Sequence, residues 1–181
     1  TLAELSDLLG GESYVTSSLV YPMVFQEMNN QLPEGNGIVA QMLAAIRGEL
    51  ADRFNIYSAQ MIMASLCDPN HWTLGFLEDE VKVNHYKELF KQEIIQTGKQ
   101  MGMADKHIQC AIYLYNYHWD TERRQGVLDF WSEKTKNKDD KPWQILGQMA
   151  MKYLAIQASS VASERGFSAL KLILIPKRGM L

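Results

Sequence analysis

The sequence has few cysteines and no long apolar run, and each shortage excludes a class of protein. Only Cys67 and Cys110 are present among 181 residues, and neither has a CxxC partner, so we interpret both as reduced, unreactive thiols. No apolar run approaches the roughly 18 residues of a membrane span, and the first residues lack the basic start and apolar core of a signal peptide. The sequence therefore predicts a cytosolic or nuclear protein without membrane contact. Because it begins with Thr1, we also expect a piece of a longer protein.

The motifs of common catalytic centres are missing as well. No GxGxxG or GxxxxGK[ST] phosphate loop and no GxSxG elbow is present. The histidines never fall at the i, i+3 or i+4 spacing that places two metal ligands on one helix face, so we expect ordinary surface or boundary residues: His71, His85, His107 and His118. We interpret the ten methionines as core filler, among them Met61, Met63, Met101, Met103, Met149 and Met151. The tryptophans are interpreted as core or interface aromatics: Trp72, Trp119, Trp131 and Trp143.

Charge is divided unevenly along the chain. Residues 131–181 hold nine Lys and Arg against four Asp and Glu, whereas residues 1–130 hold nine against 17. A basic end on an acidic body is typical of a contact with nucleic acid or an acidic partner. Lysines of residues 132–141 alternate with acids, however, and this pattern favours a solvated loop. Both interpretations stay open, and the loop is favoured.

Helical patterns dominate what is present. Apolar residues recur at three-and-four spacing over residues 16–32, 35–54, 59–67, 78–101, 123–134 and 142–156. Residues 108–119 alternate enough to fit a strand, but a buried helix fits too and is favoured. No internal repeat or low-complexity tract occurs, so the sequence predicts one mainly helical unit.

Caps and prolines place several ends of these helices. We expect Ser18 to cap the first, with Pro22 near the first turn, and Ser58 to cap the third. The Asp68–Pro69 dipeptide should end that third helix, because the residue before a proline is disfavoured in helical geometry. Pro142 suits the first position of the helix over residues 142–156.

The spacing also predicts which residues form the apolar face of each helix. These are Ile38, Met42, Ala45, Ile46 and Leu50 in residues 35–54; Val81, His85, Leu89 and Phe90 in residues 78–101; Val127, Leu128 and Trp131 in residues 123–134; and Leu146, Met149, Ala150, Tyr153 and Leu154 in residues 142–156.

The last residues carry a longer, more specific pattern. The string "MAMKYLAIQASSVASERGFSALKLILIPKRGML" over residues 149–181 resembles the C-terminal region of hAT-family transposases, written A..YL.IP.SS..SER.FS..G......R..L. The matching residues are Ala150, Tyr153, Leu154, Ile156, Ser159, Ser160, Ser163, Glu164, Arg165, Phe167, Ser168, Arg178 and Leu181. Upstream, "ASLCDPNHWTLGFL" is similar to the family's LDPR.K...FL element, and "LDFWSEK" to its aromatic pair.

The resemblance implies a fold and a division of the chain. The chain would be the C-terminal third of such a protein, without its BED-type zinc finger and the start of its catalytic domain. A helical array is implied, with residues 1–141 resembling the family's helical insertion. The array would also include the last helices of an RNase H-like domain, and residues 142–181 would be the C-terminal dimerisation segment that contains the Ser-Glu-Arg motif.

Glu164 is open to two interpretations. In the family, the glutamate of the Ser-Glu-Arg motif joins two aspartates in holding divalent ions, so Glu164 would be the third acid of a DDE-type site with Mg²⁺ or Mn²⁺. The matching aspartates would precede Thr1, so this chain needs no cofactor and cannot cut DNA alone. From the residues themselves, Ser160 is a good helix N-cap and Glu164 a first-turn acid, while Arg165 can pair with a carboxylate. This structural role is favoured.

The resemblance also implies partners. We favour an interaction module that forms a homodimer or higher homo-oligomer, in which Tyr153, Leu154, Phe167, Leu170 and Leu174 provide packing residues. The longer protein would be a nuclear DNA-binding protein, in one version a host regulator of transcription derived from a transposase. The alternative is a part of an active DNA transposase.

Overall fold

The computed structural model describes residues 15–29, 37–56, 58–117 and 126–156 of the chain. These residues form seven helices and no strand. The helices are α2 (Ser17–Asn29), α3 (Ile38–Ile56), α4 (Ser58–Leu66), α5 (Glu80–Gln100), α6 (Asp105–Tyr117), α7 (Val127–Lys134) and α8 (Lys141–Leu154). The predicted mainly helical fold is therefore confirmed, and the segment left open between strand and helix is α6.

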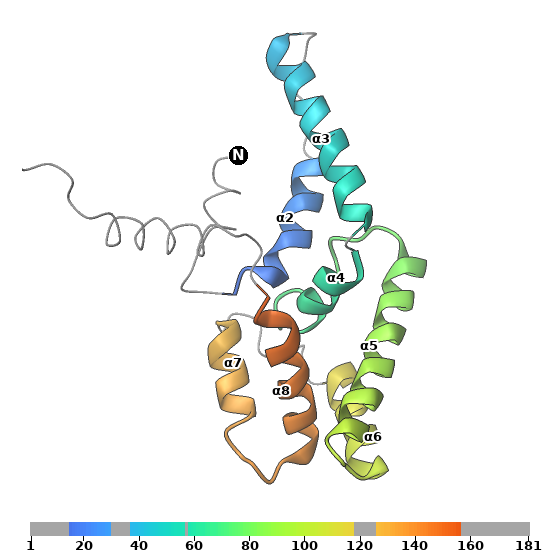
Figure 1. Ribbon diagram of the computed structural model, residues 1–181, viewed down its shortest axis with the longest axis vertical. Coiled ribbons are helices and arrows are strands. Elements are labelled where there is room, and N and C mark those ends of the chain that lie inside the picture. The colour runs from blue at the N-terminus through green and yellow to red at the C-terminus, as the bar shows by residue number, and fades with distance from the viewer. Residues whose placement is uncertain (1–14, 30–36, 57, 118–125, 157–181) are drawn as a thin grey trace, which may run out of the picture.

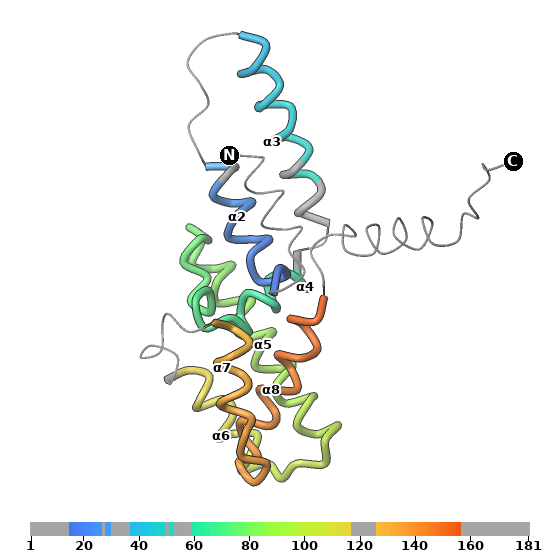
Figure 2. The backbone as a smooth tube through the Cα atoms, turned by 90° about the vertical axis from the view of Figure 1, so that its left-hand side faces the viewer, coloured from blue at the N-terminus to red at the C-terminus, as the bar shows by residue number. Residues whose placement is uncertain are grey.

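The helices form a packed body from which one helix projects. In Figures 1 and 2, α4 to α8 cluster at one end, α2 lies beside α4, and α3 extends away at the opposite end. α8 packs against α2, α4, α5, α6 and α7, so it is the centre of the core. The largest fully buried side chains are Tyr115, Phe90, Phe130, Ile62, Leu66, Leu74, Ile94, Ile108, Ile145, Leu146 and Met149.

The start of α2 corrects the predicted cap. The helix begins at Ser17, so Ser18 lies inside the first turn, and its hydroxyl donates to Asp68 Oδ2 at 2.6 Å instead of capping the helix. Pro22 lies further inside α2 than expected. A proline has no N–H to bond the carbonyl four residues earlier, and here the Ser65 hydroxyl donates to that Ser18 carbonyl at 3.0 Å. The bond that proline removes is thus replaced from α4.

The connection from α4 to α5 is a tightly bonded loop, as the Asp68–Pro69 dipeptide predicts. α4 ends at Leu66, and Asp68, 1% exposed, accepts hydrogen bonds from both the backbone N–H (2.8 Å) and the side-chain amide (3.0 Å) of Asn70. Leu74 has φ of 56°, which is unfavourable for a branched residue, yet its side chain is fully buried. Burial of that side chain offsets the backbone strain. The side chain of Ser58 lies outside the described set, so its capping role stays a prediction.

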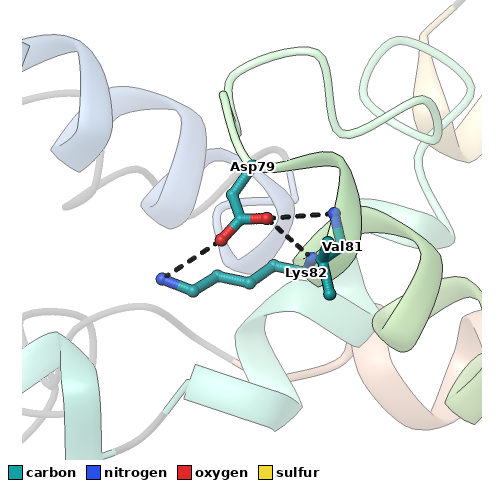
Figure 3. A network of polar contacts seen from close by, with 3 residues as sticks. All are labelled: Asp79, Val81 and Lys82. Carbon is teal, nitrogen blue, oxygen red and sulfur yellow. Dashed lines mark hydrogen bonds and ion pairs between the residues drawn. The ribbon is translucent and has the colours of Figure 1, made fainter.

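Helix α5 begins at a carboxylate cap. Asp79 Oδ1 accepts from the backbone N–H groups of Val81 (2.9 Å) and Lys82 (3.2 Å), and its other oxygen lies 4.0 Å from Lys82 Nζ (Figure 3). This satisfies two of the N–H groups that a helix start leaves without partners.

The predicted apolar face of α5 is partly wrong. Val81 is 79% exposed and His85 is exposed, whereas the buried residues are Phe90, Ile94, Thr97 and Gly98. The buried residues lie in the second half of α5. Gly98 permits the close approach of α6 there, because a Cβ on it would lie 2.6 Å from Ile108 Cγ1.

The last two helices follow the sequence more closely. All five apolar residues predicted for α8 are buried, and Pro142 lies in its first turn as expected. In α7, Trp131 is buried as predicted, but Leu128 is 58% exposed, and Phe130, which the pattern omitted, is buried.

The remaining residue types divide between core and surface. Met63 and Met149 are buried and Met61 and Met103 pack against the core. Met42, Met101 and Met151 are exposed, so the core-filler prediction is wrong for these three. Trp143 is buried and Trp72 partly buried. His71 and His107 are half-buried and His85 is exposed, as expected for ordinary histidines. Trp119 and His118 lie outside the described residues.

Candidate functional site

An apolar groove runs between α7 and α8. Its volume is about 610 Å³, and its lining includes Met101 at the end of α5, Leu128 and Trp131 of α7, and Ala150, Met151 and Leu154 of α8. We call it the α7–α8 groove. The two helices lie side by side in Figures 1 and 2.

Trp131 forms a fixed wall of the groove. Its indole N–H donates to the Cys67 carbonyl at 2.9 Å, which ties α7 to the loop after α4. The Trp131 ring also meets Phe130 and Trp143 edge-on, with centroids 5.2 and 6.3 Å apart. A buried indole with its N–H satisfied is held in one orientation. The wall is therefore preformed.

The turn between α7 and α8 holds the helices at a set distance. Gln144 Nε2 donates to the carbonyls of Thr135 and Asn137, each at 3.0 Å, and Thr135 Oγ1 donates to the Trp131 carbonyl at 2.6 Å. Gly147 faces Thr135 so closely that a Cβ would lie 2.2 Å from Thr135 Cγ2. Only glycine permits this approach without movement of Thr135.

The groove presents apolar side chains to solvent. Met151 is 64%, Leu128 58% and Met101 36% exposed. Polar residues complete the lining, including Ser132, Lys138 and Gln148. An apolar centre with a polar rim is the composition of a protein–protein contact surface.

Burial changes the acidity of two groups near the groove. Burial and the neighbouring Asp68 raise the pKa of the Cys67 thiol well above its ordinary value, so it stays protonated and unreactive. Burial also raises the pKa of the Tyr153 hydroxyl. Within the described residues, no group of three or more His, Cys, Asp and Glu side chains could hold a metal ion. The same part of the chain contains no helix long and apolar enough to cross a membrane.

The predicted site residues fall into two sets. Tyr153 and Leu154 are 7% and 9% exposed and pack into the chain's own core. The others lie outside the described residues: Ser160, Glu164, Arg165, Phe167, Leu170 and Leu174. Tyr153 and Leu154 are therefore the two predicted site residues that lie within the described part of the chain.

No sequence pattern predicted the groove itself. The spacing places Leu128 on an apolar helix face, and Met151 is predicted to be core filler. In α8 the buried positions include Leu146, Met149, Ala150 and Tyr153, and Met151 is an additional apolar residue off that stripe. An apolar residue beside a complete buried stripe is the signal that could have revealed an exposed apolar surface.

The fold and the groove together define a class: a helical protein with a preformed apolar surface groove. Residues 110–180 match the family model described as the hAT family C-terminal dimerisation region. The resemblance to hAT-family transposases is thus confirmed for this part of the chain, which includes most of α6 and all of α7 and α8. No curated protein and no solved structure matches the chain.

Proposed function

We propose that this chain is a self-association region of a hAT transposase-like protein and that it pairs with a second copy of itself. The observation that carries the proposal is an overlap. The family match over residues 110–180 includes both helices whose exposed apolar side chains, Leu128 and Met151, border the α7–α8 groove. The free energy falls when a partner covers exposed apolar surface of this kind and removes it from water.

Two-fold pairing fits a region of this kind. In a symmetric dimer both copies use the same surfaces, so every contact of one chain is repeated by the other. The patch lies on a well-packed body, because α8 contacts five other helices. Its residues therefore need little ordering on association, which lowers the cost of binding.

Sedimentation velocity of the whole chain over a range of concentrations tests the proposal. We expect the apparent mass to approach twice 20.7 kDa as concentration rises. A mass of one chain at every concentration would exclude self-association by this chain.

The longer protein is proposed to be a nuclear DNA-binding protein. Support comes from the family match and from the basic balance of residues 131–181, since Lys and Arg provide salt-dependent affinity for phosphates. The longer protein should bind duplex DNA with an affinity that falls steeply with salt, and it should enter the nucleus when expressed with a fluorescent tag. A salt-independent affinity or a cytoplasmic signal would contradict this part.

A catalytic role of Glu164 is the alternative function. Its support is the Ser163-Glu164-Arg165 sequence inside the matched region. In the longer protein with both upstream aspartates and Mg²⁺ or Mn²⁺ present, Glu164→Gln would abolish strand cleavage with unchanged assembly if Glu164 is catalytic. Loss of folding stability, with no cleavage by either form, would support the structural role of the glutamate at a helix start.

A further inference from the structure

We propose that residues 170–176 of one copy, LKLILIP, occupy the α7–α8 groove of the second copy, so that the pair is held by exchanged C-terminal segments. The inference rests on the proposed function and deepens it by naming both contact surfaces. The groove is described above, and the segment belongs to the same matched region.

The exposed apolar area of the groove is too small to hold two chains together by itself. Stable interfaces bury roughly 800 Å² on each partner. Met101, Leu128 and Met151 are the exposed large apolar residues of the groove, and three side chains meeting their own copies provide too little area. A second apolar element must fill the groove between them.

Residues 170–176 have the composition to fill it. They contain Leu170 and the four consecutive residues Leu172, Ile173, Leu174 and Ile175, which are the longest uninterrupted run of large aliphatic residues after α8. Burial of aliphatic side chains contributes about 25 cal/mol of favourable free energy for each Å² of surface removed from water. An apolar groove and an apolar segment therefore complement each other.

The segment starts close enough to reach a neighbouring groove. Leu154 and Ala155, which line the groove, directly precede the last described residue, Ile156. Leu170 lies 14 positions after Ile156 in the sequence. Such a connection spans about 21 Å if helical and up to about 50 Å if extended. Either length is sufficient to leave one chain and cross to a partner packed beside it.

Charges around the groove and the segment would set the orientation of the segment. Lys171, Lys177 and Arg178 flank or interrupt the segment. α7 carries Asp129 and Glu133, both exposed and four residues apart on the helix that bears Leu128. The groove lining also contains a cation, Lys138, so the charges bias orientation while apolar burial supplies the affinity.

Exchange between chains explains pairing better than docking within one chain. A segment folded onto its own groove would cover Leu128 and Met151. Tyr113 would then be the remaining exposed large apolar side chain among the described residues 110–117 and 126–156. A dimerisation region with that surface would have little to bury on pairing.

Mixing two defective variants tests the exchange. Met151→Lys puts a charge in the groove, and a second variant carries Leu172→Glu and Leu174→Glu together. Each alone should weaken self-association at least about tenfold, the effect of losing roughly 1.4 kcal/mol of binding free energy. Mixed one to one, they should associate again, because the first supplies an intact segment and the second an intact groove.

Controls separate loss of pairing from loss of folding. Met42→Lys, at an equally exposed apolar position of α3, should leave the dissociation constant unchanged. Each variant should keep the far-ultraviolet circular dichroism of the parent chain. If the groove variant unfolds, Met151→Gln provides a milder change with the same expected direction.

A disulfide trap gives an independent readout. With Cys110→Ser to remove the exposed thiol, Met151→Cys and Leu172→Cys in one chain should oxidise to a covalent dimer. Mass spectrometry should find residues 151 and 172 linked between chains mixed from two isotope labels. A link confined to single chains would overturn the exchange.

The outcomes distinguish this inference from the proposed function. A dimer whose affinity is unaffected by both variants, or whose defects are not restored on mixing, overturns the segment exchange and leaves self-association standing. A chain that is monomeric before any substitution overturns both. Restoration on mixing together with an interchain link establishes the exchange.

Discussion

Helices α8 and α3 carry similar apolar patterns but have opposite fates. In α8, eight of 14 residues are buried, and every predicted apolar residue is among them. In α3, 19 residues long, no described side chain is buried, and Ile38, Val39 and Met42 are 84%, 65% and 63% exposed. Figure 1 shows the reason: α8 is surrounded by other helices, whereas α3 projects from the body beside α2. A stripe of apolar residues thus indicates a helix that can be buried, but not whether a neighbour covers it.

The largest expected contrast comes from one substitution made in both regions. Ile145→Ala in α8 removes a fully buried side chain and should lower the free energy of unfolding by about 2–5 kcal/mol. Ile38→Ala in α3 should change it by less than about 0.5 kcal/mol. Urea unfolding followed by circular dichroism, at one protein concentration, measures both.

A similar loss for the two variants would break the comparison. It would show that α3 is covered in the associated protein, since a truly exposed isoleucine contributes little packing energy.

The next largest effect concerns the hydrogen bond from Ser65 of α4 to α2, which, unlike α3, is packed against the core. Ser65→Ala removes the hydroxyl that donates to the Ser18 carbonyl, and an unsatisfied buried carbonyl should cost roughly 1–3 kcal/mol. In a Pro22→Ala background the restored N–H can bond the same carbonyl, so Ser65→Ala should cost less. A double-mutant cycle by chemical unfolding measures this coupling. Equal costs in the two backgrounds would show that the hydroxyl does not replace the missing helix bond.

A pH effect separates the buried thiol from the exposed one. The native state keeps the Cys67 proton above the ordinary pKa of 9.0, while the unfolded chain releases it. The unfolded state then binds fewer protons, so the free energy of unfolding falls as pH rises above that value, by about 1.4 kcal/mol per pH unit.

Unfolding measured from about pH 8 to about pH 10 tests this effect, within the range of the ordinary thiol pKa. Cys67→Ser should flatten the decline, whereas Cys110→Ser, on the exposed side of α6, should not. A decline that persists unchanged without Cys67 would assign it to other groups, such as Tyr115, whose pKa burial also raises.

The smallest effect is expected at the surface of α8. Lys152 Nζ donates to Glu93 Oε1 of α5 and lies 5.0 Å from the Tyr153 ring centroid. Because the Lys152 side chain is 58% exposed, Lys152→Ala should cost only about 0.2–1 kcal/mol, and less at high salt. Thermal unfolding at two salt concentrations measures it, with Lys106→Ala at an exposed position of α6 as the control. A salt-independent loss of several kcal/mol would mean that Lys152 stabilises by packing.

Local sequence signals predicted the helices well for physical reasons. Asp68–Pro69 ends α4 and Pro142 begins α8 because proline restricts the backbone of its own residue and the one before it. The Ser18 cap was wrong because its hydroxyl bonds Asp68, 50 residues away. No pattern within one helix contains that partner.

The candidate site was predicted only in part. The Ser-Glu-Arg string pointed to the hAT resemblance, and the family match confirms it for residues 110–180. The groove was not predicted, because it requires Met101 from α5 beside Leu128 and Met151. Those three residues meet only when three separate helices pack.

The sequence by itself determined where most helices lie and that residues 110–180 match the hAT family C-terminal dimerisation region. Helix formation depends on backbone hydrogen bonds between residues four apart in the sequence. The family pattern is likewise a series of residue types along the chain, so both can be read without the tertiary structure. The tertiary structure alone decided that Met149 is buried while Met151, two residues on, borders an open groove. Burial depends on which distant helices cover a given side of α8, and that arrangement follows from packing of the whole core.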